Sequence, residues 1–365
     1  MKNVERIIRL FSVYFSKQPA YLILFVTSRC NARCKMCFNW QNNNRASKEQ
    51  ELSLSEIISI SEHFKNIMQF TISGGEPFLR DDISEIVNSF YKNSRARMIT
   101  IPTNGSFPEK IATATVRILE NCPSCLLNVG LSIDGIGEKH DQIRQLPGCF
   151  DLAVETYHRL NRLRKKYNNF YLKMTTVLSK YNKDEIEHLF DYADKHFDID
   201  EHELLLARGN TRDPSATNLS ARDYKDAIRI VNKYAAKNCK TRNIQFSRLL
   251  CSLYKQMQTV TYQTISQNKM IYPCLAGKRL VEIYDDGAVV PCEILKTINK
   301  NIPATMGNLR DFHYDIQRVL RSKEAIEIID YIEKTECRCS FECAVLTNIV
   351  FNPFAYPALL KKFFA

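Results

Sequence analysis

The stretch YLILFVTSRCNARCKMC, residues 21–37, decides how the chain folds and what it can hold. Its first six residues form a short apolar run that is typical of a buried strand. Cys30, Cys34 and Cys37 follow at once in a polar loop, separated by three and then two residues. Three thiolates on one compact loop can hold three irons of a cubane [4Fe-4S] cluster. The spacing therefore predicts an iron–sulfur site after the first strand, with a fourth iron open to a small molecule.

The same loop could instead be a zinc knuckle or contain three unrelated buried cysteines. A structural zinc site normally has four protein ligands, and the loop contains neither a histidine nor a fourth cysteine. The position of the three cysteines directly after a strand also argues against three unrelated buried cysteines. We therefore favour the cluster.

Short apolar strands recur downstream and alternate with helical patterns. Strands are expected at residues 69–72, 98–102, 128–133, 171–177 and 203–206, and helices at 83–91, 111–119, 152–167 and 183–196. Ser53 and Glu56 have capping-box spacing, which predicts another helix from Ser53. This alternation predicts a parallel sheet, either open or closed into a barrel. In both cases ligands bind where the strands end.

Polar motifs follow three of these strands. The second strand ends in Ser73-Gly74-Gly75-Glu76-Pro77, where two glycines permit close backbone approach and Glu76 offers acceptor oxygens. Thr103-Asn104-Gly105 ends the third strand, and Ser132-Ile133-Asp134-Gly135 ends the fourth, with His140-Asp141-Gln142-Ile143-Arg144 downstream. Each motif alone could be an ordinary turn.

Taken together, these motifs resemble the radical SAM superfamily, and the resemblance covers most of the chain. In that family the open iron binds S-adenosylmethionine (SAM), and one electron cleaves SAM to methionine and a 5′-deoxyadenosyl radical, which takes a hydrogen from the substrate. The resemblance implies an α/β fold, a partial parallel (β/α)6 barrel with a small C-terminal iron–sulfur module. It also implies SAM contacts from Met36, Gly74, Gly75, Glu76, Pro77, Asn104, Ser132 and Arg144.

The chain departs from the family pattern at two positions. Gln145 stands where glycine is usual, and Cys149 stands where serine is common. Neither change removes a group proposed to touch SAM. Asp134 is a candidate substrate base, although an aspartate after a strand is more often a turn or cap residue.

A second group of cysteines lies in the C-terminal part. Cys274 is followed after twelve residues by Gly287 and after four more by Cys292, and a hairpin turning at Gly287 would bring the two cysteines together. Cys337, Cys339 and Cys343 lie further on, so five cysteines are available for one site. The arrangement resembles the auxiliary-cluster hairpin of SPASM and twitch domains.

A full SPASM domain holds two clusters and needs a further cysteine, whereas none follows Cys343. The resemblance therefore implies a second, single auxiliary [4Fe-4S] cluster. Cys274 and Cys292 are two expected ligands, and two more come from Cys337, Cys339 and Cys343, without an indication of which thiol is spare. A four-thiolate zinc site is an alternative, because tetrahedral sulfur also suits zinc.

Five segments are expected along the chain. They are an N-terminal amphipathic helix (1–20), the radical SAM partial barrel (21–215), a helical linker (216–271), the SPASM/twitch-like auxiliary cluster domain (272–347) and a hydrophobic tail (348–365). A Gly-, Asn- and Ser-containing loop at 208–218 separates the barrel from the linker.

The composition limits where the protein can be located and which partners it can bind. The longest apolar run near the start has six residues, too few to span a bilayer, and the N-terminus lacks a secretory pattern. We therefore expect a cytoplasmic protein, in which thirteen cysteines favour metal ligation over disulfides. A net charge of +11 suits an anionic partner, but no specific nucleic acid is expected.

The expected enzyme oxidises or otherwise modifies a peptide, a carbohydrate or a related small molecule, with an electron donor such as flavodoxin or ferredoxin. A fully ligated auxiliary cluster would accept an electron from the substrate radical, whereas an open one could ligate the substrate. One alternative is a membrane-associated enzyme acting on a lipid, because both terminal segments combine apolar and basic residues. Another is a non-catalytic Fe–S or zinc protein for redox sensing or nucleic-acid binding, which would leave residues 74–77, Ser132 and Arg144 unexplained.

Overall fold

The fold is built around one nine-stranded sheet in the computed structural model, which describes residues 12–16, 18–238, 244–295, 302–303, 305–334 and 337–364. The strand order is β6-β5-β4-β3-β2-β1-β7-β8-β9, and neighbouring strands from β6 to β7 are parallel. The strands are β1 (Tyr21–Phe25), β2 (Gln69–Ser73), β3 (Met98–Thr103), β4 (Leu126–Ser132), β5 (Phe170–Leu178), β6 (Glu201–Leu206), β7 (Leu280–Ile283), β8 (Ala288–Val290) and β9 (Gly307–Asn308). The predicted partial (β/α)6 barrel is confirmed.

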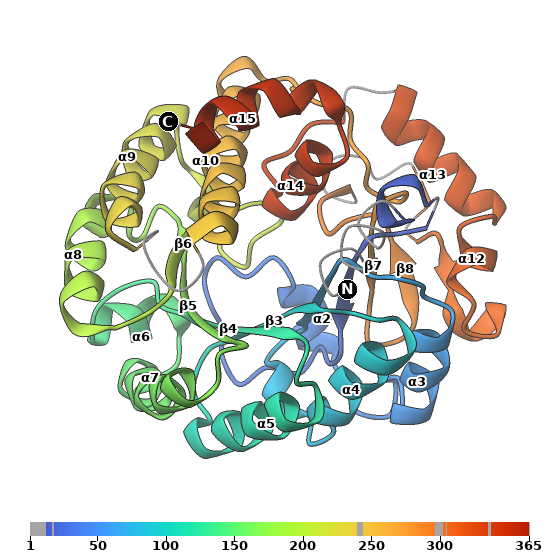
Figure 1. The fold of residues 1–365 in the computed structure, drawn as a ribbon, viewed down its shortest axis with the longest axis horizontal. Coiled ribbons are helices and arrows are strands. Elements are labelled where there is room, and N and C mark those ends of the chain that lie inside the picture. Colours follow the sequence, from blue (N-terminus) through green and yellow to red (C-terminus); the bar gives the residue numbers. More distant parts are fainter. Residues whose placement is uncertain are drawn as a thin grey trace.

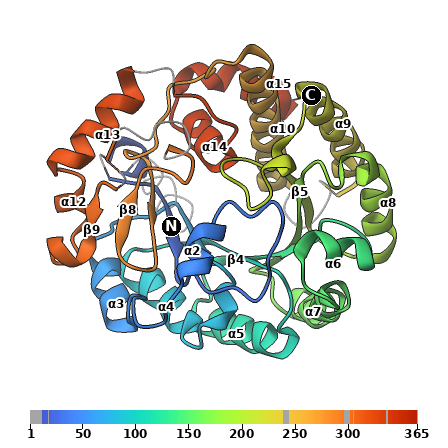
Figure 2. The same cartoon turned by 180° about the vertical axis from the view of Figure 1, so that it is seen from behind.

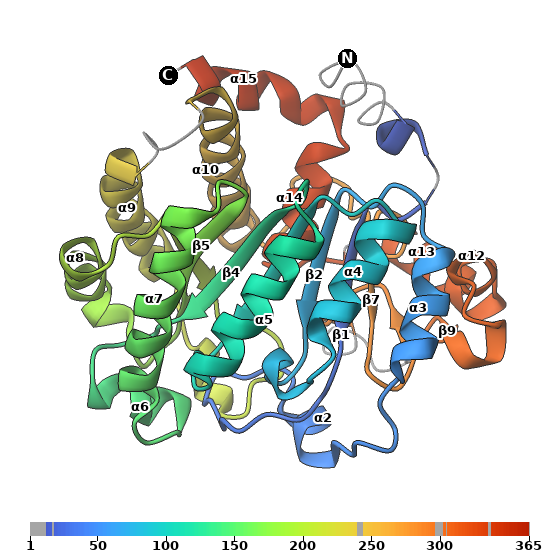
Figure 3. The ribbon, with the colours of Figure 1, turned by 60° about the horizontal axis from the view of Figure 1, so that its bottom comes forward.

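Helices cover the outside of the curved sheet (Figures 1 and 3). They are α3 (Leu54–Glu62), α4 (Ile83–Asn93), α5 (Pro108–Asn121), α6 (Glu138–Arg144), α7 (Cys149–Lys166) and α8 (Ile186–His196), whereas α2 (Trp40–Arg45) lies beyond one end of the strands. The predicted capping box at the start of α3 is present, since Glu56 N–H donates to Ser53 Oγ and Ser53 N–H donates to Glu56 Oε2. Sequence patterns thus placed the strands and most of these helices.

The remaining helices belong to the second half of the chain. They are α9 (Ala221–Asn238), α10 (Ile244–Gln267), α12 (Ile316–Val319), α13 (Lys323–Lys334), α14 (Glu342–Val350) and α15 (Tyr356–Phe364). Met257 and Val260 of α10 pack against Val345 and Ile349 of α14. In Figure 2 these two helices stand across the gap between β6 and β7, where the sheet does not close.

The predicted hairpin over residues 280–290 is present as β7 and β8, which turn at Asp286 and Gly287. Its first strand pairs with β1, with Leu22 opposite Val281. The sequence alone suggested a separate small unit here. In the structure the hairpin extends the barrel sheet, because β1 would otherwise leave its edge unpaired.

The two terminal segments differ in how far the structure describes them. Residues 1–11 and 17 of the expected N-terminal helix lie outside the described residues, and residues 12–15 are helical. Among the residues described, no single helix is long and apolar enough to cross a membrane. Taken together, α14 and α15 have the necessary length and composition, but the pair is bent by 95°.

Candidate functional site

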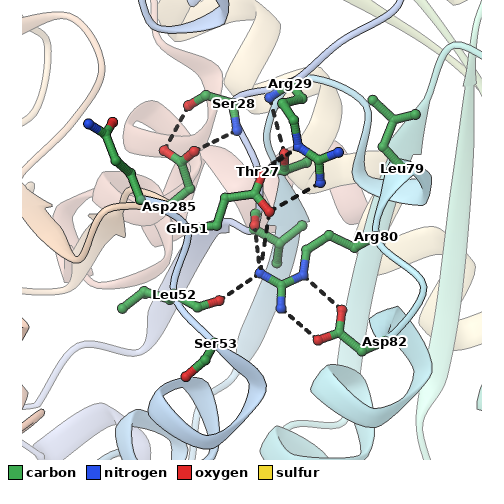
Figure 4. Close-up of polar contacts among 12 residues, drawn as sticks. Thr27, Ser28, Arg29, Glu51, Leu52, Ser53, Leu79, Arg80, Asp82 and Asp285 are labelled. Atoms are coloured by element: carbon green, nitrogen blue, oxygen red, sulfur yellow. Dashed lines mark hydrogen bonds and ion pairs between the residues drawn. The ribbon is translucent and has the colours of Figure 1, made fainter. Parts of the chain in front are cut away.

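The cysteine loop begins where β1 ends, and the hairpin tip holds its first residues (Figure 4). Asp285 accepts hydrogen bonds from Ser28 N–H and Ser28 Oγ, both at 2.7 Å. Glu51 accepts from Thr27 Oγ1 and forms a bidentate pair with Arg29. A buried carboxylate that accepts two donors fixes the backbone strongly. The two residues before Cys30 are therefore fixed by segments distant in sequence.

The two glycines after β2 pack against the backbone of this loop. Gly75 N–H donates to Thr27 O (2.7 Å), and Glu76 N–H donates to Arg29 O (2.9 Å). A Cβ at Gly74 would lie 2.3 Å from Thr27 O, and one at Gly75 would lie 2.1 Å from Arg29 O. Glycine is required here because the two loops touch through their backbones.

Two further segments hold the loop from its other side. Arg33 N–H and Lys35 N–H donate to the carbonyls of Arg144 and Ile143, at the end of α6. After β6, Arg212 N–H donates to Cys37 O at 3.0 Å. The cysteine loop is thus bound by backbone hydrogen bonds from segments after β2, β4 and β6.

A cavity of about 330 Å³ lies inside the barrel against this loop. Its lining includes Cys30, Cys34 and Cys37 and all eight residues expected to contact SAM, namely Met36, Gly74, Gly75, Glu76, Pro77, Asn104, Ser132 and Arg144. Residues at the ends of β2, β3 and β4, at the end of α6 and in the cysteine loop therefore share one space. Asp134 is not part of the lining.

Glu76 is a buried carboxyl group at the edge of this cavity. It accepts hydrogen bonds from Thr103 Oγ1 (2.7 Å) and from Asn104 N–H (2.8 Å). Burial raises its pKa to about 6, and these hydrogen bonds act in the opposite direction. The carboxyl group is held rigidly and presented to the cavity.

Arg144 is held by Asp134 on the opposite wall. Arg144 Nε lies 2.6 Å from Asp134 Oδ2, and Asp134 Oδ1 accepts from Val177 N–H at 2.8 Å. The carboxylate is fully buried, and it is the ion-pair partner of Arg144. His140 and Asp141 of the same motif are structural, since His140 Nδ1 accepts from Asp134 N–H and Asp141 accepts from the start of α7.

Four of the C-terminal cysteines are linked by their effects on one another's pKa, whereas Cys343 lines the cavity. Burial and the neighbouring thiols of Cys339 and Cys274 raise the pKa of Cys292. Burial raises the pKa of Cys339 to about 12 and that of Cys337 to about 11, with further contributions from Cys274 in both cases. Cys274, Cys292, Cys337 and Cys339 therefore lie near one another.

Cys343 lies on the wall of the 330 Å³ cavity instead. Tyr21 Oη donates to its Sγ at 3.3 Å. Burial raises its pKa to about 12, and the charges that act on it belong to Arg208, Glu293 and Glu342. The sequence did not identify this separation, because cysteine spacing along a chain does not report which way a helix turns its thiol.

Buried charges opposite the cysteine loop were not predicted from the sequence. Lys173 Nζ lies 2.5 Å from Glu203 Oε2. Arg208 contacts Glu293 at 2.8 Å and Glu342 at 2.5 Å. All five side chains line the cavity. Strand alternation, with Lys173 and Glu203 facing inward from β5 and β6, was the one signal that could have indicated them.

The described residues contain no ready-made site for a single metal ion. A mononuclear site needs its ligand atoms within about 2.3 Å of one ion. Over the described ranges, no three Cys, His, Asp or Glu side chains converge in that way.

Comparison with known proteins agrees with this site. A profile of the radical SAM superfamily matches residues 24–193, which include the cysteine loop and the motifs after β2, β3 and β4. Residues 24–193 thus form a radical SAM domain, and the chain is a radical SAM enzyme. A [4Fe-4S] cluster and SAM are accordingly cofactors of this radical SAM enzyme.

Relatives of this radical SAM enzyme differ in name and in coverage. It is 25% identical to an AdoMet-dependent heme synthase of Methanosarcina barkeri over 315 residues, 82% of each chain. It is 25% identical to a GTP 3′,8-cyclase of Clostridium perfringens over 187 residues, 50% of this chain and 54% of the cyclase. The chain spans only about half the length of the cyclase.

Solved structures extend the likeness over the whole fold. Streptococcus suis SuiB bound to S-adenosylmethionine has a TM-score of 0.62 at 17% identity, covering 95% of this chain and 76% of SuiB. The anSMEcpe enzyme with bound AdoMet has a TM-score of 0.59 at 16% identity, and the match covers 94% of this chain and 95% of anSMEcpe. At this identity the likeness concerns the fold alone.

Proposed function

We propose that the enzyme reductively cleaves SAM in the 330 Å³ cavity and takes a hydrogen atom from a substrate bound beside it. Cys30, Cys34 and Cys37 would hold the SAM-binding cluster. The observation that supports this proposal is the convergence of these thiols and the eight predicted SAM contacts on one cavity. When bound, the cluster and SAM together supply a 5′-deoxyadenosyl radical.

The polar side chains around the cavity would orient SAM. Glu76 would accept from its amino group, and the Arg144 fork would bind its carboxylate. Met36, Gly74, Gly75, Pro77, Asn104 and Ser132 would shape the remaining surface. Asp134 would position Arg144, because both of its oxygens are engaged and it does not line the cavity.

A second cluster would bind to Cys274, Cys292, Cys337 and Cys339, and Cys343 would be the spare thiol. Four neighbouring cysteines would complete the coordination of a cubane. A fully ligated cluster favours electron transfer over substrate ligation. The overall outcome would then be a two-electron oxidation, in which the substrate loses one hydrogen atom, one electron and one proton.

The substrate is proposed only as a class. The names of the relatives indicate GTP and haem-related molecules, and anSMEcpe and SuiB have been solved with peptides. We propose a small-molecule or peptide substrate, with flavodoxin or ferredoxin as electron donor. The exposed side chains of Phe354 (86%) and Leu360 (54%) near Lys361 support peripheral membrane contact as a secondary proposal, which co-sedimentation with anionic liposomes tests.

Anaerobic reconstitution tests the main proposal. With SAM and dithionite, the wild type should form 5′-deoxyadenosine and Cys30→Ala should form none. Cys149→Ala is the matched control, because Cys149 is buried outside the cavity lining. A variant lacking Cys30 that still cleaved SAM would refute the assignment of the loop.

Iron analysis tests the second cluster. The reconstituted wild type should hold about eight irons, and Cys339→Ser about four. Cys343→Ser should retain about eight. Equal iron loss in both variants would show that Cys343 is a ligand, and wild-type protein with four irons would contradict the second cluster.

A further inference from the structure

The cysteine loop turns successive side chains to opposite sides. From Cys30 to Met36, every second residue lines the cavity, whereas Arg33 and Lys35, which lie between these residues, do not. The Arg33 side chain is exposed and that of Lys35 is half-buried. Figure 3 shows this loop at the lower end of the barrel, between α6 and α2. The loop therefore has an inner face toward the cavity and an outer face that carries cations.

The sequence around this loop contains cations but no carboxyl groups. Residues 28–48 include no Asp or Glu, and their five cations are Arg29, Arg33, Lys35, Arg45 and Lys48. Arg29 pairs with Glu51. Within the part of the chain that the structure describes, none of the other four cations forms an ion pair. Most of the positive charge of this stretch is therefore unpaired.

Two neighbouring loops place further cations beside Lys35. Its Nζ lies 4.6 Å from the centroid of the Tyr181 ring, and exposed Lys180 precedes that tyrosine. The Arg212 guanidinium lies 5.8 Å from the centroid of the Trp40 ring. Neither Lys180 nor Arg212 has an ion-pair partner among the described residues. We call Arg33, Lys35, Lys180 and Arg212 the cationic face.

Asp213 brings a carboxylate to the cationic face. Its N–H donates to Lys35 O at 2.8 Å, and its carboxylate accepts from Tyr181 Oη and from Ser215 N–H. These hydrogen bonds lower the pKa of Asp213, with a smaller contribution from the charge of Lys180. One carboxylate does not balance four cations, so the face keeps a net positive charge.

The cationic face lies against the backbone that carries the thiols. Arg212 N–H donates to Cys37 O at 3.0 Å, and Arg33 Nη1 lies 3.3 Å from Cys30 O. Burial raises the pKa of Cys37 to about 12, and the charge of Arg212 acts in the opposite direction. A molecule that docks on this face is therefore close to the thiols without entering the cavity.

We propose that the cationic face docks an acidic electron-donor protein, which reduces the cluster of the cysteine loop. Negative charges on the donor would pair with the unpaired cations and guide it to this face. Trp40 and Tyr181 lie among these cations, and aromatic side chains are enriched in protein interfaces. SAM and the substrate bind on the inner face, so neither competes with the donor.

The electron transfer is balanced without a further reagent. A flavodoxin in its hydroquinone anion form loses one electron and becomes the neutral semiquinone. The cluster gains that electron, and no proton moves. The inference rests on the proposed function in placing a cluster on this loop.

Binding of oxidised flavodoxin to the reconstituted enzyme tests the docking surface. Calorimetry at about 0.01 M salt, where charges act over about 30 Å, should show about tenfold weaker binding in Lys35→Glu and in Lys180→Glu. Arg117→Glu is the matched control, because Arg117 is an exposed cation near the end of α5, where the strands begin. This control should bind as the wild type does. At about 1 M salt all four proteins should bind flavodoxin weakly and alike.

Stopped-flow mixing with hydroquinone flavodoxin should show the semiquinone forming more slowly in Lys35→Glu and Lys180→Glu. Three results would overturn the proposal: no binding of flavodoxin to the wild type at low salt, equal affinity in all four proteins, or an equally large loss in Arg117→Glu. Circular dichroism and iron content identify a variant that has not folded, and the other variant then decides. Dithionite bypasses docking, so 5′-deoxyadenosine formed with dithionite tests the proposed function separately.

Discussion

Gly75 shows how one residue supports the metal site without a side chain. Its amide donates to Thr27 O, and its α-carbon lies so close to the cysteine loop that an added Cβ would be 2.1 Å from Arg29 O and 2.9 Å from Cys30 Cβ. Backbone atoms cannot yield by rotating a side chain. The loop itself would have to move.

We expect Gly75→Ala to lose the cluster of the cysteine loop, because Cys30 would be displaced. Iron content should fall from about eight to about four, and 5′-deoxyadenosine formation should cease. Gly148→Ala is the control, since φ at Gly148 is +73° but no atom lies within 4 Å of the added Cβ. Full iron content in Gly75→Ala would contradict the packing argument.

Gln145 has a backbone conformation that glycine adopts more easily. It ends α6 with φ +49° and ψ +48°, a left-handed conformation that costs a residue with a Cβ about 1 kcal/mol. Its backbone immediately follows Arg144, whose carbonyl holds the cysteine loop. The chain tolerates glutamine here at some cost in stability.

Gln145→Gly should therefore raise the free energy of unfolding by up to about 1 kcal/mol while leaving SAM cleavage unchanged. Thermal unfolding of the reconstituted enzyme measures the gain. Asn268→Gly, at another non-glycine residue with positive φ (+52°), is a comparison far from the site. A lower melting temperature for Gln145→Gly would show that the glutamine side chain contributes a contact that outweighs the strain.

At the scale of elements, the β7–β8 hairpin connects the two cysteine regions. Cys274 and Cys292 flank it in sequence, and Asp285 at its tip accepts both hydrogen bonds from Ser28. Leu52 N–H also donates to Asp285 O at 2.6 Å. The hairpin therefore contributes to the auxiliary site and supports the start of the cysteine loop.

Asp285→Asn should weaken that support, because an amide has one acceptor oxygen for two donors. We expect a loss of about 1–3 kcal/mol and a several-fold faster release of iron from the cysteine loop to a chelator. Asp286→Asn is the matched control, since exposed Asp286 accepts one hydrogen bond, from Ala288 N–H, and asparagine keeps that acceptor. Equal iron release in the two variants would refute the connection.

At the scale of the molecule, the C-terminal part packs back onto the first barrel helices. Arg310 Nε lies 2.7 Å from Glu56 Oε1, and Tyr314 Oη donates to the same oxygen at 3.1 Å. Hydrogen bonding to Arg310 lowers the pKa of Glu56 from its ordinary value near 4.5 to about 2. The contact thus joins α3 to the segment after β9.

A lowered pKa in the folded state means that this pair stabilises the fold above about pH 4.5 and that its contribution disappears as pH falls toward 2. Glu56→Gln keeps the capping shape but removes the charge. The melting temperature of this variant should be below that of the wild type at pH 7. The difference between the two melting temperatures should be smaller at pH 4. A difference in melting temperature that did not depend on pH would show that charge pairing with Arg310 does not contribute to the stability of the fold.

Much of the fold was predictable because its signals are local. Apolar runs predicted the strands, capping-box spacing predicted the start of α3, and Gly287 predicted the hairpin turn. The sequence also proposed Gly74, Ser132 and Arg144 as SAM contacts, and these three residues line one cavity, since Gly74 follows β2, Ser132 ends β4 and Arg144 ends the helix after β4. Parallel strands bring those ends to one edge of the sheet.

Other parts depended on contacts between distant segments. The pairing of β7 with β1, the support of Ser28 by Asp285 and the charge cluster of Arg208, Glu293 and Glu342 join residues 85 or more positions apart. Local spacing carries no record of such contacts. The position of Cys343 on the cavity wall, beside Tyr21, was equally hidden.

By itself, the sequence determined the chemistry of the cysteine loop and the order of strands and helices, because both follow from spacing along the chain. Only the tertiary structure decided which cysteines are neighbours and which charges line the barrel. Those properties depend on which face each element turns inward, and packing against the rest of the molecule sets that face.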